Sequence, residues 1–133
     1  MPIEKQLSVF VENKPGRLSG ICNTLGENGI NIIAMSIHDT VDHAIIRLIV
    51  DNPTKALIIL EEEGVYIVPQ DVVVTSIENE PGRIAMIAKK LFLADINIEY
   101  AYCTATKTQE IGSLVLKTED AERTLEILEE SGL

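Results

Sequence analysis

The feature that most constrains this chain is an internal repeat, because a stretch of its first half returns in its second half. The run Asn13-Lys-Pro-Gly-Arg-Leu18 recurs as Asn79-Glu-Pro-Gly-Arg-Ile84, an offset of 66 residues from position 13 to position 79. The same offset carries Ile30-Asn-Ile32 onto Ile96-Asn-Ile98. Self-similarity at a fixed period indicates repeated structural units, so we expect two copies of one fold.

Within each copy the hydrophobic pattern changes in the same order. Residues 7–11 alternate as a half-buried strand, and residues 18–25 have the spacing of an amphipathic helix. Turn and cap signals then divide the rest of the first copy into two strands, a helix and a last strand, at residues 30–37, 44–50, 52–64 and 65–68. The second copy repeats the order at residues 72–77, 84–91, 97–103, 111–116 and 119–130.

The order βαββαβ predicts the α+β class, with two tandem ferredoxin-like units whose antiparallel sheets carry their helices on one face. We place the units at residues 1–70 and 71–133 and expect a sheet of eight or nearly eight strands. The second copy stops where residues 65–68 form the last strand of the first. We therefore expect the second unit to lack an edge strand or to borrow one from a partner, since an unpaired edge invites association.

Charge and composition narrow the class of partner. The chain has 133 residues and a formal net charge of -10, which repels phosphate backbones and anionic lipid headgroups. We therefore expect neither nucleic acid nor membrane as a partner. The beginning of the sequence has no signal-peptide pattern, and Cys22 and Cys103 suit a reducing compartment, so we expect a cytoplasmic protein.

The repeated turn carries the chemistry that we expect of a binding site. Its pattern is Asn-x-Pro-Gly-Arg followed by an aliphatic residue, between the first strand and the first helix of each copy. Proline suits the first position of a helix, and glycine leaves the backbone open to close approach. Amide hydrogens of a first helical turn lack helical partners and lie at the positive end of the helix dipole, so they can bind a carboxylate. We assign these amides to Gly16, Arg17, Leu18, Gly82, Arg83 and Ile84.

A plainer interpretation is that Pro-Gly only starts a helix and that the arginine is a solvated side chain. The duplication favours function, because the copies have diverged widely and still share five polar or turn residues. Both keep the Asn, Pro, Gly and Arg of the turn and the Asn at the start of the next strand, Asn31 or Asn97. Packing alone seldom requires all five.

These residues resemble the ACT domain, the regulatory module of amino-acid metabolic enzymes, and in particular stand-alone proteins made of two tandem ACT domains. The resemblance rests on the two Asn-x-Pro-Gly-Arg turns with Gly29-Ile-Asn-Ile32 and Asp95-Ile-Asn-Ile98, where Asp95 departs from the usual glycine. It implies a non-catalytic sensor without a cofactor, a homodimer that regulates a metabolic enzyme or another regulator. An amino acid would be held between the Pro-Gly turn of one unit and the second strand of its neighbour. The implied ligand-binding residues are Asn13, Pro15, Gly16, Arg17, Leu18, Asn31, Ile32, Asn79, Pro81, Gly82, Arg83, Ile84, Asn97 and Ile98.

Besides a purely protein-interaction role for the same fold, two other classes of function stay open on the residues alone. Acylphosphatases share the fold and use an arginine in the first turn with an asparagine on a following strand, which Arg17 and Asn31 resemble, although the glycine-rich signature of that family is absent. A metal site is the second, built from His38 and His43 with Asp39 or Asp42 at the hairpin turn. 

Tyr100 and Tyr102 stand where the first copy has Ala34 and Ser36. We consider two roles for these tyrosines, packing in a core or interface and lining a ligand pocket.

Overall fold

The computed structural model describes residues 3–104 and 107–132. Their strands and helices follow the predicted order and confirm the α+β class with two βαββαβ units. The elements are β1 (Ile3–Glu12), α1 (Arg17–Glu27), β2 (Ile32–Asp39), β3 (His43–Val50), α2 (Pro53–Glu62), β4 (Tyr66–Glu78), α3 (Arg83–Leu93), β5 (Ile98–Thr104), β6 (Ile111–Thr118) and α4 (Ala121–Glu130).

The chain divides into two compact units. One contains residues 5–70, and the other contains the described residues of 1–4 and 71–133. Strands β1 and β4 therefore each supply residues to both units. The predicted division at residues 1–70 and 71–133 stays a prediction, and residues 3 and 4 are grouped with the second half of the chain.

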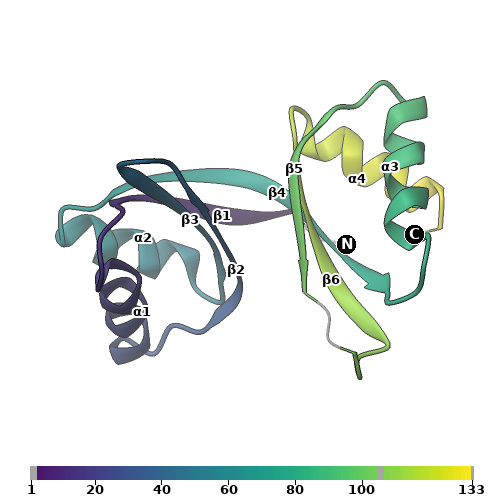
Figure 1. The fold of residues 1–133 in the computed structure, drawn as a ribbon. Helices are drawn as coiled ribbons and strands as arrows, with labels where there is room; N and C mark the ends of the chain where they lie inside the picture. Colours follow the sequence, from purple (N-terminus) through teal and green to yellow (C-terminus); the bar gives the residue numbers. More distant parts are fainter. Residues whose placement is uncertain (1–2, 105–106, 133) are drawn as a thin grey trace. The chain divides into compact units, whose positions relative to one another are not determined.

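The unit of residues 5–70 has the strand order of a ferredoxin-like sheet, β2-β3-β1-β4, in which β3 pairs antiparallel with both β1 and β2. Helices α1 and α2 lie together on one face of this sheet (Figure 1). The core forms between the two layers because the alternating strand positions meet the helix stripes. Its buried side chains are Leu7, Val9, Ile21, Leu25, Ile30, Ile46, Leu48, Val50, Ala56, Leu60 and Ile67.

The second unit has the same order, β1-β4-β6-β5, with α3 and α4 on one face (Figure 1). Its fourth strand position, predicted to be empty or filled by a partner, is occupied by the beginning of β1, whose Ile3 packs against the core. The repeat could not reveal this, because the segment stands at the opposite end of the sequence. The core side chains are Val73, Ile77, Ile87, Leu91, Ile96, Leu114, Leu116 and Leu128.

The prediction of eight or nearly eight strands was wrong, because the described residues form six. One continuous strand, β4, stands where the patterns at residues 65–68 and 72–77 predicted two. Pro69 interrupts the pattern without ending the strand, since β4 is the edge strand of the unit of residues 5–70. Proline is tolerated in an edge strand because its nitrogen can face away from the neighbouring strand.

None of the helices in residues 3–104 and 107–132 combines the length and the apolar character needed to cross a bilayer.

Candidate functional site

The Pro-Gly pair of the first copy forms a β-turn that ends at the start of α1. The amide of Arg17 donates to the carbonyl of Lys14 at 3.4 Å, and Gly16 has φ 88° and ψ -11°. Proline followed by a residue near φ +80° and ψ 0° is a type II turn, which needs glycine at its third position. Pro15 is therefore a turn residue two positions before the helix, and its predicted place as the first helical residue was wrong.

The second copy has the same turn. The amide of Arg83 donates to the carbonyl of Glu80 at 3.4 Å, and Gly82 has φ 87° and ψ -6°. A Cβ built on Gly16 or Gly82 would meet no atom within 4 Å. The two glycines are thus required for their left-handed backbone, and the space beside each one is open.

The first turns of α1 and α3 differ from those of the other two helices. Asn52 accepts a hydrogen bond from the Lys55 amide at 3.2 Å and caps α2, while Asp120 accepts from the Arg123 amide at 3.0 Å and caps α4. Among the described residues no side chain caps α1 or α3. Amides in these two first turns therefore lack a side-chain acceptor at the positive ends of the helix dipoles.

The open amides lie one residue later than predicted. The first intrahelical bonds run from Gly20 to the carbonyl of Gly16 at 2.9 Å and from Met86 to that of Gly82 at 3.0 Å. The amides of Arg17 and Arg83 are engaged in the β-turns, so the prediction was wrong for these two. The amides between them and the first helical donor belong to Leu18, Ser19, Ile84 and Ala85.

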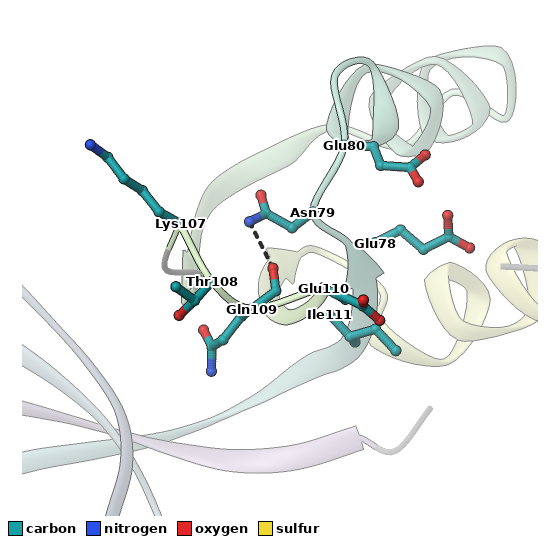
Figure 2. Close-up of a pocket in the computed structure, with 8 residues that line it drawn as sticks. All are labelled: Glu78, Asn79, Glu80, Lys107, Thr108, Gln109, Glu110 and Ile111. Atoms are coloured by element: carbon teal, nitrogen blue, oxygen red, sulfur yellow. Dashed lines mark hydrogen bonds between the residues drawn. The ribbon is translucent and has the colours of Figure 1, made fainter.

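Asn13 and Asn79 fasten the turns to the neighbouring hairpins. The Asn13 amide donates to the carbonyl of Asp42 at 3.1 Å, and its Nδ2 lies 3.5 Å from the carbonyl of Thr40. In the second copy, the Asn79 amide donates to the carbonyl of Glu110 at 2.8 Å, and its Nδ2 donates to that of Gln109 at 3.0 Å (Figure 2). The side-chain contacts of Asn13 and Asn79 with the hairpin carbonyls explain the repeated asparagine by structure alone.

The arginines of the motif are held by carboxylates that the sequence analysis did not single out. Nη2 of Arg17 lies 3.6 Å from Oε1 of Glu12, and Nη2 of Arg83 lies 2.8 Å from Oε2 of Glu78. Glu12 and Glu78 stand at the repeat offset of 66, so the repeated motif begins one residue earlier than the asparagine. Comparing the copies one position further would have found this pair.

Charged neighbours of the two arginines differ between the copies. Lys14 pairs with Glu12, and this contact, followed by the charge of Arg17, lowers the pKa of the Glu12 carboxyl from its ordinary value. The equivalent position in the second copy is Glu80, whose Oε2 lies 3.1 Å from Nη2 of Arg83. All of these groups are at least partly exposed, so their ion pairs contribute little to stability.

Asn31 and Asn97 stand just before a register shift at the start of β2 and of β5. The Asn31 amide donates to Oδ1 of Asp51 at 3.0 Å, and the Asp51 amide donates back to the Asn31 carbonyl at 3.1 Å. Both asparagine side chains are exposed. The following Ile32 and Ile98 are half-buried and pack against the two cores.

A hollow of about 310 Å³ lies beside Asn97 and is also lined by Phe92, Asp95, Ile96 and Glu119. Asp95 has φ 58°, which matches φ 71° of its counterpart Gly29. Aspartate is among the few residues with a side chain that tolerate this left-handed conformation. The departure of Asp95 from the glycine pattern therefore preserves the backbone.

Within one unit, the Pro-Gly turn and the asparagine of the next strand lie at opposite ends of a helix. Helix α1 begins at Arg17, directly after the turn, and ends four residues before Asn31. Its 11 residues span about 16 Å. A single unit therefore does not bring Arg17 and Asn31 together, as the acylphosphatase interpretation would require.

Hollows also lie beside both turns. The first, of about 130 Å³, is lined by Val11, Glu12, Asn13, Lys14, Arg17, Leu18, Ile37, Ala44 and Ile46. Its equivalent, of about 190 Å³, is lined by Ser76, Ile77, Glu78, Arg83, Ile87 and Gly132. Both are smaller than the roughly 300–1,000 Å³ of pockets for drug-sized ligands, so each suits a small group.

The largest of these hollows, about 500 Å³, lies between the second turn and the loop that joins β5 to β6 (Figure 2). Its lining includes three carboxylates, those of Glu78, Glu80 and Glu110, and one ammonium group, that of Lys107. Figure 2 shows the Asn79 side chain directed at Gln109, whereas Lys107 extends away from the turn. The lining is thus acidic.

In residues 3–104 and 107–132, no three His, Cys, Asp or Glu side chains are grouped closely enough to hold a metal ion. Tyr100 and Tyr102 are half-buried, and in the sheet they stand opposite Lys117 and Val115 of β6. This register puts both tyrosines on the face of the sheet that points away from the core residues Leu114 and Leu116. Their role as pocket residues stays a prediction.

Comparison with known proteins identifies the family. The family model described as an ACT domain pair matches residues 1–133. Protein BT0572 from Bacteroides thetaiotaomicron has 33% sequence identity and a TM-score of 0.91, over 98% of this chain and 89% of that chain. A search of the curated proteins found no match.

The chain also shares its fold with the regulatory subunit of an enzyme. The ligand-free regulatory subunit of aspartate kinase from Thermus thermophilus has 20% identity and a TM-score of 0.72, over 98% of this chain and 93% of that chain. At this identity the likeness shows a common fold. On its repeated turns, its strand order and the match over its full length, this chain belongs to the family of ACT domain pairs.

Proposed function

We propose that this ACT domain pair is a non-catalytic sensor that binds a small carboxylate ligand, an amino acid, beside its Pro-Gly turns. One observation supports the proposal most directly: two uncapped first turns with open glycines occur in the same chain as two helices with ordinary side-chain caps. Uncapped amides at a helix N-terminus favour an anion. The small hollows beside both turns suit a ligand of amino-acid size.

A neighbouring copy would complete this site through β2. The turn of Asn13 lies beside the loop that follows β2, because Asn13 contacts Thr40 and Asp42, whereas Asn31 lies at the other end of the strand. If two β2 strands pair antiparallel across a two-fold axis, Asn31 of the partner subunit comes to the end of β2 that adjoins the Pro-Gly turn. The ligand would then lie between the turn of one copy and the asparagine of the next.

The edge of β2 suits such a pairing. It is the end strand of its sheet and exposes three large apolar side chains, with Ile33 at 54%, Met35 at 40% and Ile37 at 47%. Residues 32–37 contain no charged side chain and no proline, so two of the usual protections of an edge strand are absent there. We therefore propose a homodimer through β2.

The signal would pass to another chain, a metabolic enzyme or a second regulator. The likeness to the regulatory subunit of aspartate kinase shows the fold, and the enzyme that this chain would serve stays unassigned. The cytoplasmic location belongs to the same proposal.

A thermal-shift screen of the twenty amino acids tests the ligand class. A true ligand raises the free energy of unfolding by about 2.7 kcal/mol at one hundred times its dissociation constant. A screen in which no amino acid raises the midpoint contradicts the proposal.

The location of the ligand site is tested by placing a carboxylate in the first turn of α1 and of α3. Ser19→Asp and Ala85→Asp should keep the fold, because an acidic residue near a helix N-terminus stabilises it by about 0.3–1 kcal/mol. The new carboxylate occupies the open amides and repels the ligand, so the thermal response should be lost. Ser19→Asn and Ala85→Asn are the neutral controls of nearly the same shape. A response that survives both aspartates places the ligand elsewhere.

A further inference from the structure

The outward face of α3 differs in chemistry from the equivalent face of α1. Spacing of three, four and seven residues puts four exposed side chains of α3 on one face, which we call the α3 outer face: Met86, Lys89, Lys90 and Leu93. Met86 is 42% exposed and Leu93 is 69% exposed, and the adjoining Phe92 is 76% exposed. The face is therefore both apolar and basic.

At the repeat offset, α1 carries Gly20, Asn23, Thr24 and Glu27 instead. These polar groups are satisfied within their own unit. Nδ2 of Asn23 donates to Oε1 of Glu27 at 3.2 Å, and Oγ1 of Thr24 donates to Oε1 of Glu63 at 2.8 Å. Lys89 and Lys90 form no ion pair with any described residue. The α3 outer face thus has unused charge and unused apolar surface.

The same chain carries a complementary surface on α2. Ile58, Glu61 and Glu62 are three and four residues apart, so they share one face, which we call the α2 outer face. Ile58 is 55% exposed, and neither glutamate pairs with a cation among residues 3–104 and 107–132. An acidic and apolar helix face matches a basic and apolar one in both charge and hydropathy.

We propose that the α3 outer face docks the α2 outer face of a second copy of this chain. Lys89 and Lys90 would pair with the partner's Glu61 and the partner's Glu62, while Met86 and Leu93 would cover the partner's Ile58. Copies with a net charge of -10 repel one another, so a stable contact needs a local basic surface, and the α3 outer face supplies two unpaired cations. This contact is separate from pairing through β2 and from the Pro-Gly turns.

Sedimentation equilibrium of the full chain tests the contact, in a Met35→Lys background that removes pairing through β2. This background should still self-associate. Lys89→Glu with Lys90→Glu should weaken the association by at least about tenfold, because like charges then face each other. The control, Lys107→Glu with Arg123→Glu, makes the same change in net charge at other positions. It should weaken the association much less than the Lys89→Glu, Lys90→Glu variant does. Thermal midpoints of all variants verify that they are folded.

Charge exchange identifies the partner surface. Adding Glu61→Lys and Glu62→Lys to the Lys89→Glu, Lys90→Glu variant should restore the association to within about threefold of the background. Raising the salt concentration should weaken this contact by screening, whereas pairing through the apolar β2 edge should strengthen as salt screens the repulsion between copies. A monomer at every concentration in the Met35→Lys background, an unchanged association in the lysine variant, or no restoration by the exchange would each overturn the proposal. None of these outcomes bears on ligand binding at the turns.

Discussion

The two Pro-Gly turns have the same backbone and opposite electrostatic fields. Gly16 and Gly82 differ by 1° in φ, and each turn closes on an arginine amide at 3.4 Å. Around the first turn stand two cations, Lys14 and Arg17, against the carboxylate of Glu12. Around the second, Arg83 alone faces two carboxylates.

This comparison separates what the motif provides from what its neighbours provide. The type II turn sets the direction of the amides in both copies, whereas the residue before the proline decides the sign of the local charge. An anionic ligand should therefore prefer the first turn, and the acidic hollow beside the second turn should disfavour it. Four experiments test this comparison, with expected effects that range from a loss of stability to a weak dependence on pH.

The largest effect should come from alanine at the turn glycines. Gly16→Ala and Gly82→Ala should each lower the free energy of unfolding by about 1–2 kcal/mol, because a left-handed φ is costly for a residue with a Cβ. Urea unfolding measures this, and the two losses should be equal if the backbones are equal. The control is Gly20→Ala, inside α1 with open space around it, which should stabilise by up to about 1 kcal/mol. If the turn variants gain stability as this control does, the assignment of type II turns at Gly16 and Gly82 is wrong.

The next effect concerns ligand affinity. Lys14→Glu should weaken binding at the first turn by about tenfold, equivalent to about 1.4 kcal/mol, and Glu80→Lys should strengthen binding at the second by a similar factor. Isothermal titration with the amino acid found by the thermal screen measures both. Equal affinities at the two turns in the unmodified chain, with no response to either exchange, would show that local charge does not decide occupancy.

A smaller effect should separate the two asparagines. Asn79→Ala removes a hydrogen bond of 3.0 Å and should cost about 0.5–1.5 kcal/mol in the free energy of unfolding. Asn13→Ala removes a contact of 3.5 Å and should cost less, because that geometry is at the limit of a hydrogen bond. Chemical denaturation of the two variants compares them. A larger loss for Asn13→Ala would reverse the assignment of which turn is more firmly fastened.

The smallest effect should be a dependence of stability on pH at Glu12. Its pKa is lowered in the folded protein, first by Lys14 and then by Arg17, so the folded state releases this proton more readily than the unfolded state. The contribution is therefore present above the ordinary pKa of 4.5 and is lost as the pH falls through the folded value. Unfolding measured from pH 6 to pH 3 should show a shallower loss for Glu12→Gln than for the unmodified chain. Identical pH profiles would remove this ion pair from the account.

Much of the site was predictable because it is local. The repeated Pro-Gly pair predicts a tight turn before a helix, and the periodicity of residues 18–25 and 84–91 predicts the helix itself. What failed was the position of the proline, since both a helix start and a type II turn accept it and only φ of Gly16 distinguishes them. The ion pairs of Glu12 and Glu78 were missed because the comparison of the two copies began at the asparagine, one residue after the repeated glutamate.

The sequence by itself determined the order of strands and helices in both copies, since periodicity and cap signals act between near neighbours in the chain. Tertiary structure alone decided which strand fills the fourth position of the second unit. The beginning of β1 is far in the sequence from the rest of the second unit, although β1 and β4 are neighbours in the sheet. Such pairing depends on which sheet edge is free and on which apolar side chain, here Ile3, can reach the core. Neither property can be inferred from the hydrophobic pattern of neighbouring residues.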